Sequence, residues 1–190
     1  MGCGRNGSFD IKPDLNKWAI MIFEKSSAKN HPNIHLNPGY FPGKFIETWW
    51  KMWRGQTRVF RLQPFTGHGS WDRFAYNNTP AGISPESGKV AVLTRATIKI
   101  AKLFRFWKFV PSASAQLNKQ TGLQFTVGIG EVPLIKQATF SIWDSLESIK
   151  NYAYQQAVHK EIVRLTKKEK WYSEEMFVRF QVLDDYLIQN

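Results

Sequence analysis

Apolar and polar positions in the second half of the chain follow two different periods. A helical period over residues 99–110, and again from residue 144 to about residue 170, predicts two helices. A strand-like pattern predicts four strands, at residues 89–99, 123–130, 136–143 and 174–184. The resulting order, strand–helix–strand–strand–helix–strand, is that of a ferredoxin-like fold.

The two helices carry further sequence signals. Pro111 is expected to break or kink the first helix, because proline lacks the N–H that an interior helical residue donates. The second helix is expected to begin with a capping box formed by Asp144 and Glu147. The first helix carries an apolar stripe that is expected to pack inward, made of Ile100, Leu103, Phe104 and Trp107.

The first half of the chain repeats part of this order. Lys17–Lys25 is expected to be a strand, Lys44–Gly55 a tryptophan-rich helix and Thr57–Pro64 a strand. This unit matches the last three elements of the second half, so the first repeat lacks its leading strand, helix and strand. We therefore expect Met1 to be an internal methionine of a longer reading frame.

The repeats predict an α+β fold in three parts. Residues 1–65 are expected to form a partial first ferredoxin-like half, and residues 89–190 a complete second half. Residues 66–88, rich in Gly, Asn, Pro and Ser, are expected to be a linker loop.

The segment QFTVGIGEVP contains a G-x-G that is also found in phosphate-binding loops. A dinucleotide-binding loop needs a third small residue three positions on, at the start of a helix, and Pro133 stands there instead. The residues that follow read as a strand. Gly128 and Gly130 are therefore expected to allow a bulge or close packing within a hairpin.

Composition narrows the class of protein. The chain has 190 residues, of which 43% are hydrophobic and 15% aromatic, enough to fill a packed interior. A single cysteine, Cys3, excludes an intrachain disulfide and a cysteine-based zinc site. The sequence contains neither a long apolar run nor a signal-peptide pattern, so we expect a cytoplasmic protein, with membrane association left open.

The net charge of +11 favours acidic partners, and its distribution is uneven. Between Glu86 and Glu131 the sequence has no acidic residue. Basic side chains with Phe106 and Phe109 among them are expected opposite the apolar stripe of the first helix. They suit a membrane surface, a nucleic acid, or a solvated face with Phe106 packed under a neighbour. An RNA-binding RNP pattern is absent, which makes nucleic acid unlikely as a partner. The basic residues are Lys99, Lys102, Arg105 and Lys108.

Arg95 is a charged residue within an otherwise apolar strand. Alternation places it on the face of Leu93, and a buried arginine requires an anionic partner. Glu131 is one candidate, and an acidic group of a bound cofactor is another. In the segment GSWD, Trp71 and Asp72 are expected to line a site or to close a turn.

Several segments together resemble the spheroidene monooxygenase family of carotenoid-oxidising proteins. They are VAVLTRATIK, RFW with VPSAS, VGIGEVPLIKQATFSIW, VHKEI and WYSEEMFVRFQVL, with FRLQPFTGHGSWD and GCGRNGSFDIKPDLNKW earlier in the chain. The resemblance spans nearly the whole chain. It implies ferredoxin-like halves whose sheets face each other, a dimeric-α/β-barrel-type fold with the first repeat incomplete. It also implies haem as cofactor and an acyclic carotenoid as substrate, with a methylene oxidised to a ketone.

The resemblance implies roles for specific residues. His159, beside the apolar stripe of the second helix, is the expected axial ligand of the haem iron, and His68 is the second choice. Arg95 is expected to pair with a haem propionate unless Glu131 takes that place. Trp71, Trp107 and Trp143 are expected to line the substrate pocket.

The function expected from these observations is that of a haem-dependent monooxygenase acting on an acyclic carotenoid or a similar long apolar substrate. Electrons are expected from an external donor, because flavin and nicotinamide motifs are absent. Two alternatives remain, a barrel that binds haem or an apolar ligand without catalysis, and a basic nucleic-acid-binding domain. The sequence does not fix the oligomeric state.

Overall fold

The structure, a computed structural model, describes residues 2–3, 9–22, 48, 52, 56–72, 74–76, 87–155 and 157–188. Side chains within residues 154–159 are outside that description. The chain forms two compact units. One consists of Met1–Ala19 and Leu62–Val182, and the other of Ile20–Arg61 and Leu183–Asn190.

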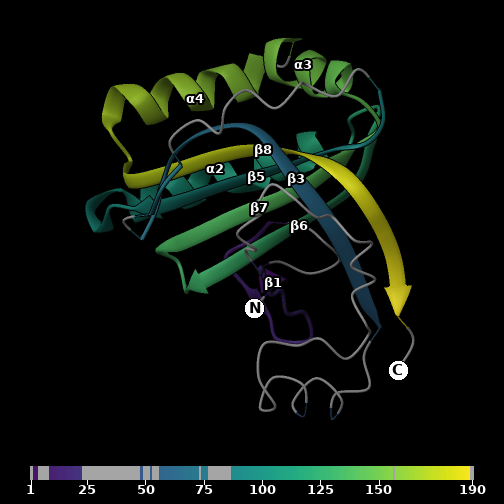
Figure 1. Ribbon diagram of the computed structural model, residues 1–190. Helices are drawn as coiled ribbons and strands as arrows, with labels where there is room; N and C mark the ends of the chain where they lie inside the picture. The colour runs from purple at the N-terminus through teal and green to yellow at the C-terminus, as the bar shows by residue number, and fades with distance from the viewer. Residues whose placement is uncertain are drawn as a thin grey trace. The chain divides into compact units, whose positions relative to one another are not determined.

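The second half of the chain has the predicted ferredoxin-like topology. Its strands lie in the sheet order β6-β7-β5-β8, and all their described pairings are antiparallel. The α+β class and the strand–helix order are therefore confirmed (Figure 1). The elements are β5 (Val90–Ile98), the 3-10 turn η2 (Ile100–Lys102), α2 (Leu103–Leu117), β6 (Leu123–Val132), β7 (Lys136–Trp143), α3 (Leu146–Gln155), α4 (Ala157–Glu169) and β8 (Tyr172–Ile188).

Four more strands extend this sheet on its two sides. β1 (Gly2–Cys3) pairs with β6 and with β2 (Pro13–Asp14). β3 (Thr57–Trp71) lies beside β8, and β4 (Phe74–Ala75) pairs with the end of β3. The predicted strand Thr57–Pro64 is thus confirmed but longer, and the first six residues of the expected linker loop belong to it.

The expected strand Lys17–Lys25 is wrong where the structure describes it. Residues 17–22 form no regular element, and Trp18, Ile20 and Ile22 are exposed. The main-chain N–H of Lys17 donates to the Asp14 carbonyl at 3.3 Å, which places a turn where the strand was expected to begin. Of the expected helix 44–55, residues 48 and 52 are described and helical, and the rest lies outside the described residues.

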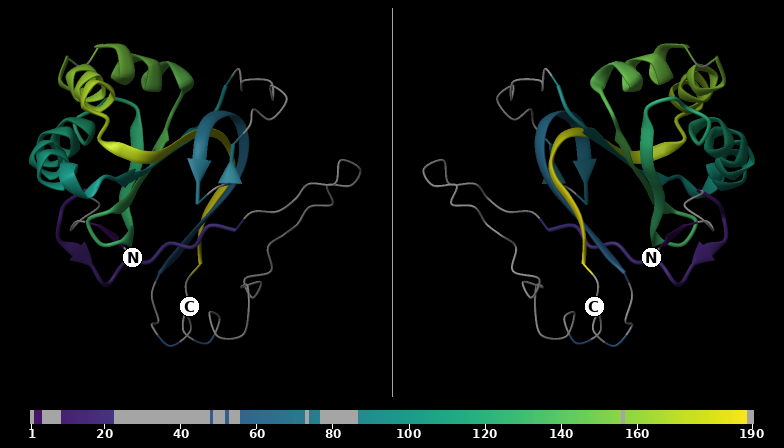
Figure 2. Two further views of the ribbon diagram at one scale, coloured as in Figure 1. Left: turned by 90° about the vertical axis from the view of Figure 1, so that its left-hand side faces the viewer. Right: turned by 90° about the vertical axis from the view of Figure 1, so that its right-hand side faces the viewer.

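The helices cover one face of the sheet (Figure 2). Val90 and Val92 of β5 pack with Trp143 and with Ile149 of α3 in one cluster. At the other end of the strand, Ile98 packs in a second cluster made with Phe106, Val110 and Trp171. Because side chains alternate along a strand, Ala91, Leu93, Arg95 and Thr97 point to the opposite face.

That opposite face is also apolar and buried. Leu93 of β5 is flanked in register by Phe140 of β7 and Val178 of β8, all less than a tenth exposed. On β6, Phe125 is paired with Ile142, and its ring lies 6.4 Å from that of Phe140. We call these residues, with Phe180, the apolar sheet face.

The predicted inward stripe of α2 is confirmed for Leu103 and Trp107, which pack against the cluster of Ile98, and is wrong for Ile100 and Phe104. Phe106 is buried, whereas Phe104 is 88% exposed and Ile100 is 77% exposed. The helix also continues through Pro111 to Leu117, which packs in the cluster of Val90. The full length of the helix decides which face packs on the sheet, because Phe106, Val110 and Leu117 fall on one face and Phe104 does not.

The helix continues after Pro111 because both of its ends are fixed in the core. Leu103 packs against the cluster of Ile98, and Leu117 packs against the cluster of Val90. The hydroxyl of Ser112 donates to the carbonyl of Phe109 at 2.9 Å, which gives one carbonyl near the proline a partner. Packing therefore outweighs the cost of the missing N–H.

The second helical region begins one residue later than predicted. Ser145 is the capping residue, since its hydroxyl accepts from the main-chain N–H of Ser148 at 3.2 Å. Asp144 instead accepts from the hydroxyls of Ser148 and Ser145 at 2.6 and 3.0 Å. These hydrogen bonds hold the pKa of Asp144 below its ordinary value.

Glycines allow close approach of strands at two places. The prediction that Gly128 and Gly130 lie in a hairpin is confirmed, and the β6–β7 register shifts between Gly130 and Val132. In β3, Gly69 has φ 94°, and a Cβ there would strike the carbonyl of Glu175 in β8. A side chain at Gly69 is therefore excluded both by φ and by space.

Replacing Gly69 by Ala tests this close approach. Gly69→Ala should lower the free energy of unfolding by roughly 2–5 kcal/mol, from left-handed strain together with overpacking. Gly88→Ala is the matched control, because Gly88 has φ 98° and open space where its Cβ would lie. The Gly88→Ala variant should lose about 1–2 kcal/mol of unfolding free energy, from backbone strain alone. Equal losses in urea unfolding would contradict the close approach.

Candidate functional site

Arg95 is the charged residue at the end of the apolar sheet face. It lies in β5, two residues after Leu93 and therefore on the same face of the sheet, and it is 0% exposed. A buried guanidinium requires neutralisation, since an unpaired charge in the protein interior is unstable. Its partners come from three other segments of the chain.

Three carboxylates surround the guanidinium. Nη1 donates to Glu174 of β8 at 2.6 Å, and Nη2 donates to Glu131 of β6 at 3.1 Å and to Asp72 at 3.3 Å. The ion pair between Arg95 and Glu131, one of the two partners considered from the sequence, is confirmed. Lys136 of β7 completes the group by donating to Asp72. We call these five residues the Arg95 cluster.

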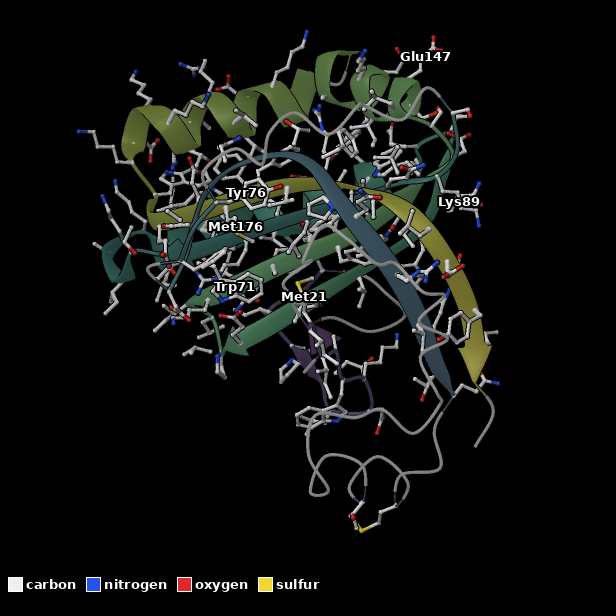
Figure 3. The ribbon with its side chains drawn as sticks, viewed as in Figure 1. Met21, Trp71, Tyr76, Lys89, Glu147 and Met176 are labelled. Atoms are coloured by element: carbon white, nitrogen blue, oxygen red, sulfur yellow. The ribbon has the colours of Figure 1, made fainter. Side chains whose placement is uncertain are left out.

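The turn after β3 is held by the same cluster. The hydroxyl of Ser70 donates to Glu174 at 2.8 Å, and the main-chain N–H of Asp72 donates to Glu174 at 3.2 Å. The ring of Trp71 lies over the guanidinium of Arg95, with the centroid 5.1 Å away. Figure 3 marks Trp71 and Met176, the residue paired with Arg95 across β5 and β8. Asp72 itself has φ 46°, the left-handed region.

Charge pairing shifts the pKa values in the cluster. The hydrogen bond from Lys136, with the charge of Arg95, holds the pKa of Asp72 below its ordinary value. Burial would lower the pKa of Arg95, but hydrogen bonds to Glu174 and Glu131 outweigh it and the pKa is raised. Both groups are thus ionised at neutral pH. Three carboxylates against two cations give the cluster a net charge of −1.

These contacts do not fit a haem propionate at Arg95. Both terminal nitrogens of the guanidinium already donate to carboxylates, and its Nε is buried without a hydrogen-bond partner among the described residues. A propionate would add negative charge to a cluster that is already negative. The local chemistry therefore assigns Arg95 to an internal ion-pair cluster.

The candidate iron ligands lie in other elements. His159 belongs to α4, and its side chain is outside the described part of the structure. His68 lies in β3, is exposed, and stacks on Phe177 with ring centroids 5.6 Å apart. Phe177 packs with the helix-side cluster, so His68 is not part of the apolar sheet face. The described residues contain no group of three or more His, Cys, Asp or Glu that could hold a metal ion.

The three tryptophans named as pocket lining are not brought together. Trp71 covers Arg95, whereas Trp107 of α2 donates to the Leu134 carbonyl at 3.1 Å. Trp143 is buried on the helix side, where it donates to Ser141 at 2.9 Å and packs on Tyr152. Burial raises the pKa of Tyr152 to about 12, so its phenol stays protonated. Trp71 alone of the three lies beside the apolar sheet face.

Sequence reasoning missed Glu174 and Lys136 as members of the cluster. Both lie on the face of Arg95, because Glu174 pairs with Thr97 across β5 and β8, and Lys136 pairs with Thr97 across β5 and β7. Strand alternation places each on that face, but the register that brings them to Arg95 depends on the fold. The arrangement can anchor a turn and close one end of an apolar surface.

Three curated relatives align with nearly the whole chain. A spheroidene monooxygenase of Rhodobacter capsulatus is 34% identical over 188 residues, covering 96% of this chain and 73% of the relative. One from Cereibacter sphaeroides is 31% identical over 183 residues, 96% of this chain and 54% of the relative. One from Rubrivivax gelatinosus is 32% identical over 181 residues, 95% of this chain and 66% of the relative. No family model matches the sequence.

Solved structures give weaker likenesses. SnoaB, a cofactor-independent oxygenase from Streptomyces nogalater, is 14% identical with a TM-score of 0.41, over 52% of this chain and 96% of that one. A monooxygenase-like protein from Listeria innocua is 15% identical with a TM-score of 0.39, over 70% of this chain and 86% of that one. At these scores the likenesses say nothing about ligand or activity.

Arg95→Met tests the cluster through stability. Removing the buried cation leaves three partly exposed carboxylates facing one another without neutralisation, so the free energy of unfolding should fall by about 3 kcal/mol at pH 7. Those carboxylates would then bind protons more readily in the folded state, so the loss should shrink at pH 5. Urea unfolding at both pH values measures this.

Arg105→Met is the matched control. Arg105 also pairs with a carboxylate, Glu169 at 2.9 Å, but its side chain is 45% exposed. Its loss should be much smaller and nearly independent of pH between 5 and 7, because solvent screens an exposed pair. Similar losses for the two variants, or a loss for Arg95→Met that grows on acidification, would contradict the cluster.

Proposed function

The chain belongs to the spheroidene monooxygenase family, as the sequence resemblance predicted, and from this premise we propose that it oxidises an acyclic carotenoid to a ketone. The expectation of a monooxygenase, an oxidoreductase, is confirmed by that membership. The chain spans between 54% and 73% of the lengths of these relatives, so the proposal concerns the reaction in which this part of the protein takes part.

The apolar sheet face is the observation that carries the substrate proposal. A polyene offers few hydrogen bonds, so a protein must bind it by shape and by apolar contact. Leu93, Phe140 and Val178 supply a continuous aliphatic and aromatic surface across three strands. Phe125 is half-buried at the side of this surface, on β6.

The Arg95 cluster has a positioning role in this proposal. It closes one end of the apolar sheet face and holds the turn after β3 against the sheet. Trp71 covers the guanidinium, which separates the charge from an apolar chain lying beside it. The cluster would thus keep a polyene in register along the strands without a hydrogen bond to it.

We propose haem as the cofactor, with His159 of α4 as the iron ligand. Because α4 covers the face of the sheet opposite the apolar sheet face, this proposal is independent of the proposed substrate surface and is tested separately. Haem would supply the activation of dioxygen, which ordinary side chains cannot perform. Each oxygenation inserts one oxygen atom into a C–H bond, and the other leaves as water with two electrons and two protons from an external donor. A second round at the same carbon gives a geminal diol, which loses water to form the ketone.

Substitution of Phe125 tests the substrate surface. In a host that makes an acyclic carotenoid, Phe125→Ala should lower the yield of ketone roughly tenfold, the effect of about 1.4 kcal/mol on the barrier. Phe109→Ala is the matched control, because Phe109 is also half-buried but lies on the helix side, stacked on Trp171. Carotenoid analysis by mass measures the yield at equal protein level.

The outcomes separate the proposals. Equal yields from the Phe125 and Phe109 variants would contradict the apolar sheet face as the substrate surface. Carotenoid that copurifies with the protein but is never oxidised, with a working reductase present, would favour a carrier of apolar ligands over an enzyme.

Spectroscopy tests the cofactor. Protein purified with added haem should show a Soret band that His159→Ala weakens or shifts, while His68→Ala leaves it unchanged. His68 is the control because it is exposed and stacked on Phe177. A band lost in the His68 variant instead would move the ligand to β3, and absence of any band in the wild type would contradict haem binding.

A further inference from the structure

Two large apolar side chains at the start of α2 are in contact with solvent. Ile100 is 77% exposed and Phe104 is 88% exposed. They stand four residues apart, the spacing at which side chains on a helical segment are neighbours. Among the described residues with large hydrophobic side chains, these two are the most exposed.

Basic residues surround this pair. Lys99, Arg105 and Lys108 are exposed on η2 and α2, whose first turns contain no acidic residue. α4 lies beside α2 on the same face of the sheet (Figure 2), and its end carries exposed Lys167 and Lys168. The residue before η2 is hydrogen-bonded to the segment after α4, since the main-chain N–H of Lys99 donates to the Trp171 carbonyl at 2.9 Å.

The charge of this surface is only partly neutralised. Glu169 accepts from Arg105 at 2.9 Å and lies 4.0 Å from Lys102. One carboxylate is thus shared by two cations, and within the described part of the chain Lys99 and Lys108 pair with no carboxylate. The surface therefore combines exposed apolar side chains with a positive surround.

We propose that this surface, formed by Ile100 and Phe104 with the surrounding Lys99, Arg105 and Lys108, docks on an anionic phospholipid bilayer. Apolar side chains enter the boundary between headgroups and acyl chains, and lysines near them are attracted to anionic lipid. Within the described residues, no helix is long and apolar enough to span a bilayer. The surface would therefore give peripheral attachment. The inference stands on the surface alone and does not depend on the proposed substrate.

A bilayer accounts for both parts of the surface better than a nucleic acid does. The phosphates of a nucleic acid would satisfy the lysines, and Phe104 could stack on a base. Ile100, however, is aliphatic and 77% exposed, and it would gain nothing from a phosphate backbone. Burial of Ile100 and Phe104 together requires apolar contact, which the acyl chains of a bilayer supply beside its anionic headgroups.

Vesicle sedimentation tests the proposal. The wild-type chain should sediment with vesicles in which about a third of the lipid is phosphatidylglycerol and much less with pure phosphatidylcholine. Raising the salt concentration should weaken binding. Phe104→Ser should lower the partition coefficient roughly tenfold by removing the inserted ring. Phe74→Ser is the control, since Phe74 is 65% exposed on β4 and should have no effect.

A pair of double variants tests the charge. Lys99→Glu with Lys108→Glu should lower the partition coefficient by roughly tenfold or more. The control double variant, Lys119→Glu with Lys150→Glu, changes the net charge by the same amount at exposed positions outside the proposed docking surface. It should lower the partition coefficient far less. Circular dichroism and thermal unfolding check that all variants are folded, and ketone formation is measured separately.

Several results would overturn the proposal. The wild type could bind both vesicle types equally or neither, Phe104→Ser could bind like Phe74→Ser, or the two double variants could bind alike. Binding to a short DNA or RNA duplex that is tighter than to vesicles and insensitive to Phe104→Ser would assign the surface to nucleic acid instead.

Discussion

The burial of one guanidinium constrains much of the described sheet. Arg95 is inaccessible to solvent in a central strand, so the fold must bring carboxylates to it from elsewhere. They come from β6, from β8 and from the turn after β3, segments far apart in the sequence. The register of three strands and the position of a turn are thereby tied to a single charge. This is a stronger constraint than apolar packing alone, which tolerates many arrangements.

Much of the second half could be predicted from its sequence because its local signals agree. Strand alternation located β5, β6, β7 and β8, and alternation also placed Arg95 on the face of Leu93. The predicted stripe of α2 was right for Leu103 and Trp107 but placed Phe104 inward in place of Phe106, because the short stretch before Pro111 does not distinguish the two. The rest of the helix, ending at Leu117, decides the phase, and a proline rule based on isolated helices excluded it.

The candidate site was less predictable, since its members meet through register and not through spacing. Glu131 could be named from its position near the hairpin. Glu174 and Lys136 could be assigned to the cluster only from the strand register, in which both pair with Thr97. Tryptophan content likewise suggested a pocket lining, yet Trp107 and Trp143 pack in the core between the sheet and the helices. A large aromatic residue satisfies either face of a sheet equally well, so composition cannot assign it.

The conformation of Asp72 makes the shape of one sheet corner conditional on ionisation. A left-handed backbone in a non-glycine residue is disfavoured by about 1 kcal/mol or more, and here Lys136, Arg95 and Glu174 compensate for it. Because the pKa of Asp72 is lowered in the folded state, that compensation is present at neutral pH and disappears as acid titrates the carboxyl. Protonation of Asp72 would therefore weaken the charge contacts that hold the turn after β3 to the sheet.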